Sequence, residues 1–119
     1  MNVKPSLLAD GSIGLLALEG RFDAYEESQV RSWLDAEQAA GRSHLIIDLS
    51  GVNFIDSTAL AALVRGMKLT REAEGDLLLC ALRQPVRVIF ELTRLDRVFP
   101  IFADVDEAVR HFGPSASAV

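Results

Sequence analysis

The chain has 119 residues, of which 50% are hydrophobic and 24% charged, and this balance is typical of one globular domain with its own core. Its formal net charge of −5 leaves no basic field for a phosphate backbone, which argues against nucleic acid as a partner. A single cysteine excludes an internal disulfide framework, and neither a secretory signal nor an apolar run near the roughly 18 residues of a membrane span is visible, so we expect a cytoplasmic protein without direct membrane insertion.

The first 41 residues predict a hairpin followed by an amphipathic helix. Two apolar stretches, residues 3–9 and 13–18, flank an Asp-Gly dipeptide that favours a tight turn because glycine tolerates a positive φ. Asp23 and Glu26 then have the spacing of a capping box that would start the helix. Its apolar stripe consists of Val30, Trp33 and Leu34. The stripe is short because Glu37 takes the next position at which an apolar side chain is expected.

A buried strand and a second helix follow, with a polar segment between them. Residues 45–49 form a nearly unbroken apolar run, which is typical of a strand covered on both faces in a parallel sheet. From Thr58 onward, apolar residues mark one face of a helix that Gly75 would end. We expect residues 48–58 to form a loop at the carboxyl end of the strand.

The last third of the chain repeats the alternation. Residues 77–82 again have the pattern of a buried strand, and Pro85 occupies a favoured first helical position. A short strand at residues 98–102 leads to Asp104 and Glu107, a second capping box before a final helix. The fold class is therefore α/β: a mixed, mostly parallel sheet with an N-terminal antiparallel hairpin and about four helices. The domain is expected to span residues 1–113, and residues 114–119 are expected to form a disordered C-terminal tail.

Most catalytic and cofactor sites find no support in the sequence. The glycine patterns of dinucleotide-binding and phosphate-binding loops are absent, as is a glycine-flanked nucleophilic serine. His44 and His111 lie far apart, and neither forms a cluster with Cys80 that has metal-ligand spacing. We therefore predict no metal and no cofactor, and we interpret both histidines as structural and Cys80 as a core residue.

The polar segment before the second helix is the most informative part of the chain. Asp56, Ser57 and Thr58 are three candidate capping residues in a row. Capping preference alone favours a structural role, in which one of them accepts hydrogen bonds from the first N–H groups of the helix. The segment also follows a buried parallel strand, and α/β proteins place their sites at the carboxyl ends of such strands.

The stretch LIIDLSGVNFIDSTALAALV resembles the signature of the STAS domain family, which is named for sulphate transporters and anti-sigma factor antagonists. The resemblance continues through LEGRFDAYEESQVRSWLDA, LLLCALRQPVRVIFELTRLDRVFPIF and DVDEAVRHF, which look like the remaining strands and helices of the family. It covers nearly the whole chain and implies a single STAS-like domain. Ala59 and Ala61 depart from it, because the family often has glycine at these positions.

The resemblance implies a regulatory binding protein and not an enzyme. In the antagonist branch, the serine of an Asp-Ser-Ser/Thr triplet is phosphorylated by a serine kinase that is also an anti-sigma factor. Ser57 falls at that position, with Thr58 as a less favoured acceptor. The unphosphorylated form is then expected to bind the kinase and release a sigma factor, until phosphorylation ends the binding and a serine phosphatase resets it. The implied contact surface consists of Phe54, Ile55, Asp56, Ser57, Thr58 and Ala59.

Three alternatives remain open at this point. The same resemblance also allows a STAS subunit of a lipid-transport ATPase or of a stress-sensing complex that is not regulated by phosphorylation. An enzyme would use Ser57 as a nucleophile beside Asp48 or Asp56, although the sequence places no histidine or lysine base near it. Nucleotide binding would depend on the helix N-terminus alone, without a lysine or a glycine-rich cradle.

Overall fold

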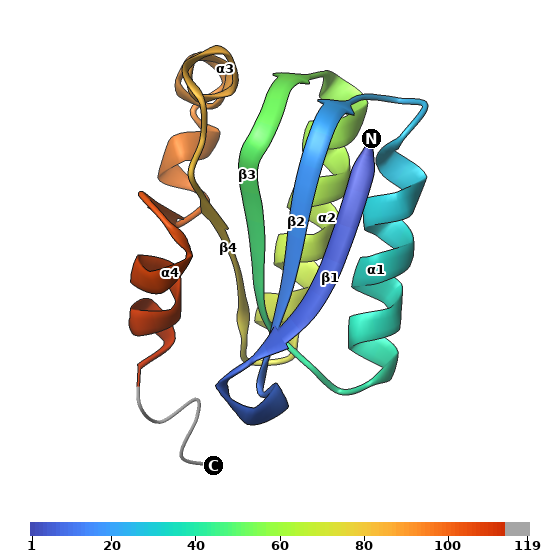
Figure 1. Ribbon diagram of the computed structural model, residues 1–119, viewed down its shortest axis with the longest axis vertical. Helices are drawn as coiled ribbons and strands as arrows, with labels where there is room; N and C mark the ends of the chain where they lie inside the picture. The colour runs from blue at the N-terminus through green and yellow to red at the C-terminus, as the bar shows by residue number, and fades with distance from the viewer. Residues whose placement is uncertain (114–119) are drawn as a thin grey trace.

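A five-stranded sheet with the strand order β1-β2-β3-β4-β5 forms the centre of the computed structural model, which describes residues 1–113 (Figure 1). The strands are β1 (Asn2–Leu8), β2 (Ile13–Phe22), β3 (His44–Ile55), β4 (Asp76–Cys80) and β5 (Ile101–Phe102). The α-helices of this part of the chain are α1 (Glu27–Ala39), α2 (Ser57–Glu72), α3 (Gln84–Leu92) and α4 (Val105–Phe112). The predicted disorder of residues 114–119 lies outside the described residues.

The pairing of the strands confirms the predicted fold class. β1 and β2 are antiparallel, whereas β2, β3, β4 and β5 run parallel to their neighbours. The hairpin turn is longer than a two-residue turn, because a 3-10 turn, η1 (Ala9–Gly11), joins its strands. Helices cover both faces of the sheet: α1, α2 and α3 enclose the larger core, and α4 covers a smaller one around Ile46 and Leu78. None of the helices in residues 1–113 is both long and apolar enough to cross a membrane.

One of the two predicted capping boxes was wrong. Asp104 caps α4 as predicted, since its Oδ1 accepts from the N–H of Glu107 at 2.8 Å. Asp23 does not cap α1, which begins only at Glu27. Its carboxylate accepts instead from the N–H of Tyr25 at 3.1 Å, and its backbone carbonyl accepts from the N–H of Glu26. Asp23 thus forms a local turn of the kind that short polar side chains favour, which moves the helix start by one turn.

The predicted loop at residues 48–58 was also wrong, because β3 continues to Ile55 and only Asp56 separates it from α2. The continuation pairs with the second half of β2 after register shifts at Ala17/Glu19 and Gly20/Arg21. Gly51 makes this pairing possible, since a Cβ atom built there would lie 2.7 Å from the carbonyl oxygen of Leu18. Because β3 is this long, α2 begins at the carboxyl end of the sheet.

Candidate functional site

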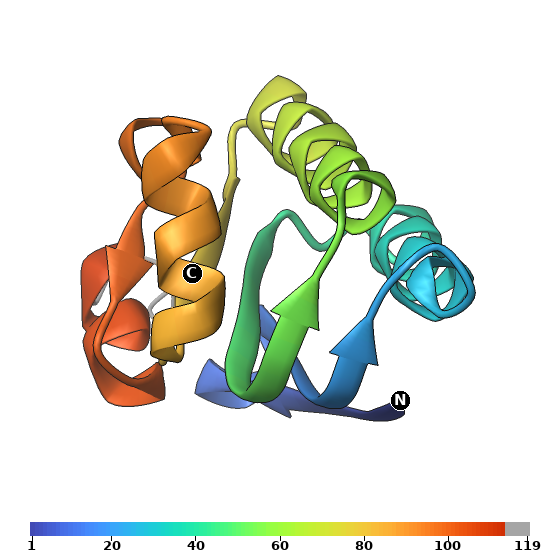
Figure 2. The same cartoon turned by 90° about the horizontal axis from the view of Figure 1, so that it is seen from above.

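The segment singled out by the sequence lies where β2 and β3 end side by side (Figure 2). In the parallel register Phe22 faces Ile55, so the two strands leave the sheet at the same level. Residues 23–26 then lead from β2 into α1, and Asp56 leads from β3 into α2. Two connections that are far apart in sequence therefore lie next to each other at the carboxyl ends of these parallel strands.

Asp56 joins these two connections through three hydrogen bonds. Its Oδ1 accepts from the N–H of Ala59 at 2.9 Å, which makes it the N-cap of α2. Its Oδ2 accepts from the N–H of Ala24 at 2.9 Å, across 32 residues of sequence. Its own N–H donates to the carbonyl oxygen of Phe22 at 3.3 Å. Both carboxylate oxygens thus accept from backbone N–H groups, one in the first turn of α2 and one in the connection between β2 and α1.

Ser57 and Thr58 are the first residues of α2, and both are exposed. The structure assigns the capping role to Asp56, the first of the three candidates in the sequence. Capping therefore accounts for Asp56 without requiring the hydroxyl groups that follow it. The two hydroxyl-bearing side chains lie at the surface of the first helical turn, where a partner can reach them.

The other predicted contact residues divide between the surface and the core. Phe54 is partly buried, and the guanidinium of Arg21 lies 3.8 Å from the centroid of its ring. Ile55 and Ala59 are only 5% and 0% exposed, so their side chains pack in the core beneath the site. Among the predicted contact residues, the side chains available at the surface are those of Phe54, Asp56, Ser57 and Thr58.

Sequence reasoning missed Tyr25, which is 92% exposed in the connection between β2 and α1. It directly follows Ala24, the residue whose N–H is bound by Asp56. The signal that could have drawn attention to it is a lone aromatic residue within the polar stretch Asp23-Ala-Tyr-Glu-Glu-Ser28. Its proximity to the second connection depends on the register between β2 and β3, which the sequence does not show.

Cys80 and His44, which the sequence analysis interpreted as structural residues, pack against other parts of the fold. Burial raises the pKa of the Cys80 thiol from 9.0 to about 12, and the negative charges of Asp48 and Asp104 act in the same direction. The thiol therefore stays protonated and unreactive at neutral pH. His44 packs edge-on against Phe112, with ring centroids 4.7 Å apart. Within residues 1–113, no group of three or more potential ligands has a geometry suited to a metal ion.

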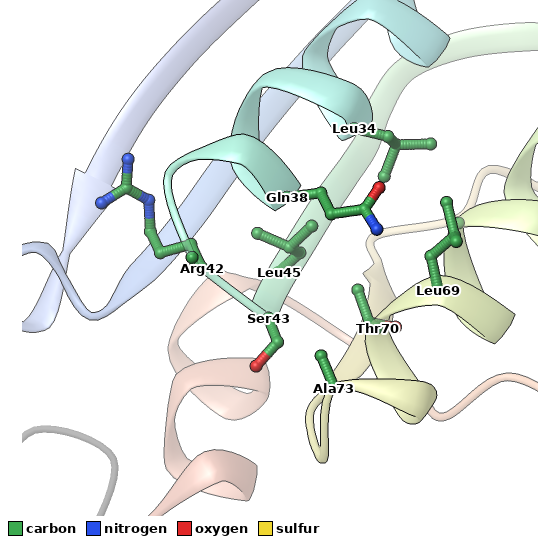
Figure 3. Close-up of a pocket in the computed structure, with 10 residues that line it drawn as sticks. Leu34, Gln38, Arg42, Ser43, Leu45, Leu69, Thr70 and Ala73 are labelled. Atoms are coloured by element: carbon green, nitrogen blue, oxygen red, sulfur yellow. The ribbon is translucent and has the colours of Figure 1, made fainter.

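A pocket of about 100 Å³ lies at the opposite end of the sheet, between the C-terminal halves of α1 and α2 (Figure 3). The side chains that Figure 3 shows around it include the apolar Leu34, Leu69 and Ala73, the polar Gln38 and Thr70, and the charged Arg42. Its volume is well below the roughly 300–1,000 Å³ of typical ligand pockets. It also lies beside the amino end of β3, so it is not part of the site around Ser57.

Comparisons with known proteins agree with the fold. The family model described as STAS domain matches residues 4–108. The anti-sigma-B factor antagonist of Listeria monocytogenes is 33% identical over 82 residues, which are 69% of this chain and 72% of the relative. The solved anti-sigma-factor antagonist (STAS) domain protein from Planctomyces limnophilus is 27% identical, with a TM-score of 0.79 and full coverage of both chains.

A more distant neighbour shows the shared fold alone. SpoIIAA of Bacillus is an anti-sigma factor antagonist that has been solved in two forms, each 17% identical to this chain. Its unphosphorylated form has a TM-score of 0.81 and covers 93% of this chain and 96% of its own. Its phosphorylated form has a TM-score of 0.74, with coverage of 93% and 99%.

Proposed function

Because this chain belongs to the STAS domain family, we propose that it is an anti-sigma factor antagonist, regulated by phosphorylation of Ser57. Its unphosphorylated form binds a serine kinase that also acts as an anti-sigma factor, and this binding releases a sigma factor. Phosphorylation of Ser57 ends the binding, and a serine phosphatase restores it. The observation that carries the proposal is the exposed Ser57 in the first turn of α2, beside an Asp56 that already supplies the cap.

The local geometry favours Ser57 as an acceptor of phosphate and not as a nucleophile of this protein's own. Both oxygens of the neighbouring Asp56 accept backbone N–H bonds, so this carboxylate is committed to holding the two connections together. A nucleophilic serine needs a free base within hydrogen-bond reach. We infer that the partner kinase supplies the catalytic groups. Thr58 is also exposed, and it remains the second candidate acceptor.

The switch acts through the contact surface and leaves the fold in place. A phosphate adds roughly −1.5 to −2 charges at neutral pH, and the dipole of α2 stabilises negative charge at its N-terminus. The same group on a docking surface must lose its hydration when a partner binds. If this penalty is about 3 kcal/mol, affinity falls roughly a hundredfold, which is enough to release the kinase. The two solved forms of SpoIIAA support the expectation that the fold accommodates phosphate.

The first test is the intact mass and the phosphosite map of this protein from its source cells. We expect a phosphoryl group on Ser57 that is lost in Ser57→Ala. The matched control is Ser28→Ala, which removes an exposed serine from the first turn of α1 and should leave the phosphate in place. Absence of phosphate under every growth condition would contradict the proposal and favour a subunit that is not regulated by phosphorylation.

A binding measurement tests the second half of the proposal. Ser57→Ala should bind the kinase constitutively, whereas Ser57→Asp should bind roughly a hundredfold more weakly, because it introduces a charge at the docking surface. Both variants should remain folded, since Ser57 is exposed and does not cap α2. Loss of the fold in Ser57→Asp would contradict a switch that acts at the surface.

A further inference from the structure

We propose that the docking surface for the kinase extends from the start of α2 onto the connection between β2 and α1, where Tyr25 is an anchor residue. Asp56 acts as a positioning residue that holds Tyr25 in a fixed place relative to Ser57. This inference rests on the proposed function, because its occupant is the kinase that phosphorylates Ser57. The expected complement on the kinase is an apolar slot for the phenol ring.

The first support comes from the hydrogen bonds of Asp56. One oxygen binds the N–H of Ala59, two residues after Ser57, and the other binds the N–H of Ala24, one residue before Tyr25. The same carboxylate therefore fixes the backbone on both sides of the proposed surface. A partner that contacts Ser57 closely meets the connection that carries Tyr25 at the same edge of the sheet.

The second support is the exposure of Tyr25. At 92%, it is the most exposed large apolar residue in the described part of the chain. A ring in this position contributes almost no buried area to folding, whereas tyrosine is enriched among the residues that dominate binding energies at protein interfaces. Leu92, at 75%, is the next most exposed, but it lies at the end of α3 and is not joined to Asp56.

The third support is the rigidity of the backbone that carries the ring. The carboxylate of Asp23 accepts from the N–H of Tyr25 at 3.1 Å, and the carbonyl of Asp23 accepts from the N–H groups of Glu26 and Glu27. Together with the bond from Ala24 to Asp56, these contacts fix the residues on either side of Tyr25. A pre-organised anchor loses little conformational freedom on binding, which favours affinity.

Tyr25 is the only tyrosine of the chain, so fluorotyrosine labelling of the full protein gives one fluorine NMR signal from this ring. The probe is the purified serine kinase that phosphorylates Ser57 in vitro, with ADP in place of ATP so that no transfer occurs. We expect the signal to shift or broaden on binding. Tyr25→Ala should weaken binding at least tenfold, and Tyr25→Phe should retain most of the affinity. Leu92→Ala is the control for an exposed apolar side chain and should change affinity less than twofold.

The positioning role is tested with a matched pair of cap variants. Asp56→Ala removes the cap of α2 and the bond to Ala24, whereas Asp104→Ala removes only the equivalent cap of α4. Asp56→Ala should move the fluorine signal of the free protein, speed hydrogen exchange at Ala24 and weaken binding about tenfold. Asp104→Ala should do none of these. Asp56→Asn, which keeps one acceptor oxygen, serves as the milder variant if Asp56→Ala does not fold.

The outcomes separate this inference from the proposed function. If Ser57→Asp loses binding and Tyr25→Ala keeps it, the docking surface does not include Tyr25 and the inference is overturned, while the proposed function stands. Equal effects of Asp56→Ala and Asp104→Ala on the fluorine signal would overturn the positioning role. If no kinase phosphorylates Ser57 or binds the wild-type chain, the proposed function fails and this inference fails with it.

Discussion

Asp56 contributes to stability as well as to the arrangement of the site. Loss of an N-cap costs about 1 kcal/mol in typical helices, and the bond to Ala24 adds a second interaction that Asp56→Ala removes. Domains of this size typically have folding free energies of about 5–15 kcal/mol, so the variant is expected to fold. Its effect on binding can therefore be separated from its effect on stability by urea denaturation.

The Cys80 thiol is expected to make the free energy of unfolding depend on pH in the alkaline range. Well below pH 9 the thiol is protonated in the folded and the unfolded chain, so it adds no pH dependence there. Between pH 9 and about 12 the unfolded thiol ionises while the buried thiol keeps its proton, because burial and the charges of Asp48 and Asp104 raise its pKa. The unfolded state then binds fewer protons, and stability falls as pH rises, by at most about 1.4 kcal/mol per pH unit from this group.

The measurement is urea denaturation at pH 7, 9, 10 and 11 for the wild-type chain and for Cys80→Ala. Other groups also titrate in this range, so the comparison of slopes isolates the thiol. We expect the free energy of unfolding to fall less steeply above pH 9 in Cys80→Ala, although this variant is less stable at pH 7 because it leaves a small cavity. Parallel slopes would show that the buried thiol does not hold its proton.

At the level of secondary structure, the length of β3 determines where α2 begins. β3 passes β2 closely at Gly51, where a Cβ atom would lie 2.7 Å from the carbonyl oxygen of Leu18 and 3.0 Å from Cα of Glu19. These are backbone atoms, which cannot move without shifting β2. Gly51→Ala is therefore expected to lower the free energy of unfolding by about 1–3 kcal/mol and to weaken kinase binding, because both connections at the site follow the displaced strands.

Gly66→Ala is the matched control for Gly51→Ala. A Cβ atom at Gly66 would approach side-chain atoms of Leu34 at 2.8 and 2.9 Å, and these atoms belong to the flexible end of the side chain. Alanine also favours the helix by up to about 1 kcal/mol over glycine, which offsets the crowding. We expect a small net change in stability and unchanged binding. Equal losses in both variants would contradict the role assigned to the backbone contact.

The elements that the sequence predicted well are those with strong local signals. The apolar run of β4, the proline at the start of α3 and the Asp104 cap of α4 are all read within a few residues. The end of β3 was missed because Ser50 and Gly51 interrupt its apolar pattern, and because its continuation depends on pairing with β2. Glu37 interrupted the stripe of α1 in the sequence. In the structure it is buried, and its carboxylate pairs with the guanidinium of the partly exposed Arg42, five residues further on.

At the scale of the whole molecule, the proposed switch requires no rearrangement of the core. Ser57 is exposed at the carboxyl end of the sheet, whereas Trp33 of α1 is only 8% exposed and packs in the core. We therefore expect phosphorylated and unphosphorylated protein to have the same tryptophan emission and melting temperatures within a few degrees. Calorimetry and fluorescence on both forms check this. A large change in either would indicate that phosphate acts through the fold.

The candidate site as a whole was only partly predictable. Ser57 and its neighbours were found through a contiguous stretch of sequence, and that stretch is specific enough to identify the family. Tyr25 and Ala24 were missed because they reach the site through the register in which Phe22 faces Ile55. The donor in the bond from Ala24 is its backbone N–H group. Since every residue except proline has this group, the residue type does not signal the hydrogen bond.

The hydrogen bond between Asp56 and Ala24 also bears on whether a short peptide can replace the folded chain. A synthetic peptide copied from residues 53–60 would carry the proposed phosphorylation triplet but neither the second connection nor the strands that place it. Such a peptide is expected to be a poor competitor and a poor kinase substrate. If the kinase contacts both connections, as proposed, it recognises only folded chains, so an unfolded copy of the chain is expected not to compete for it.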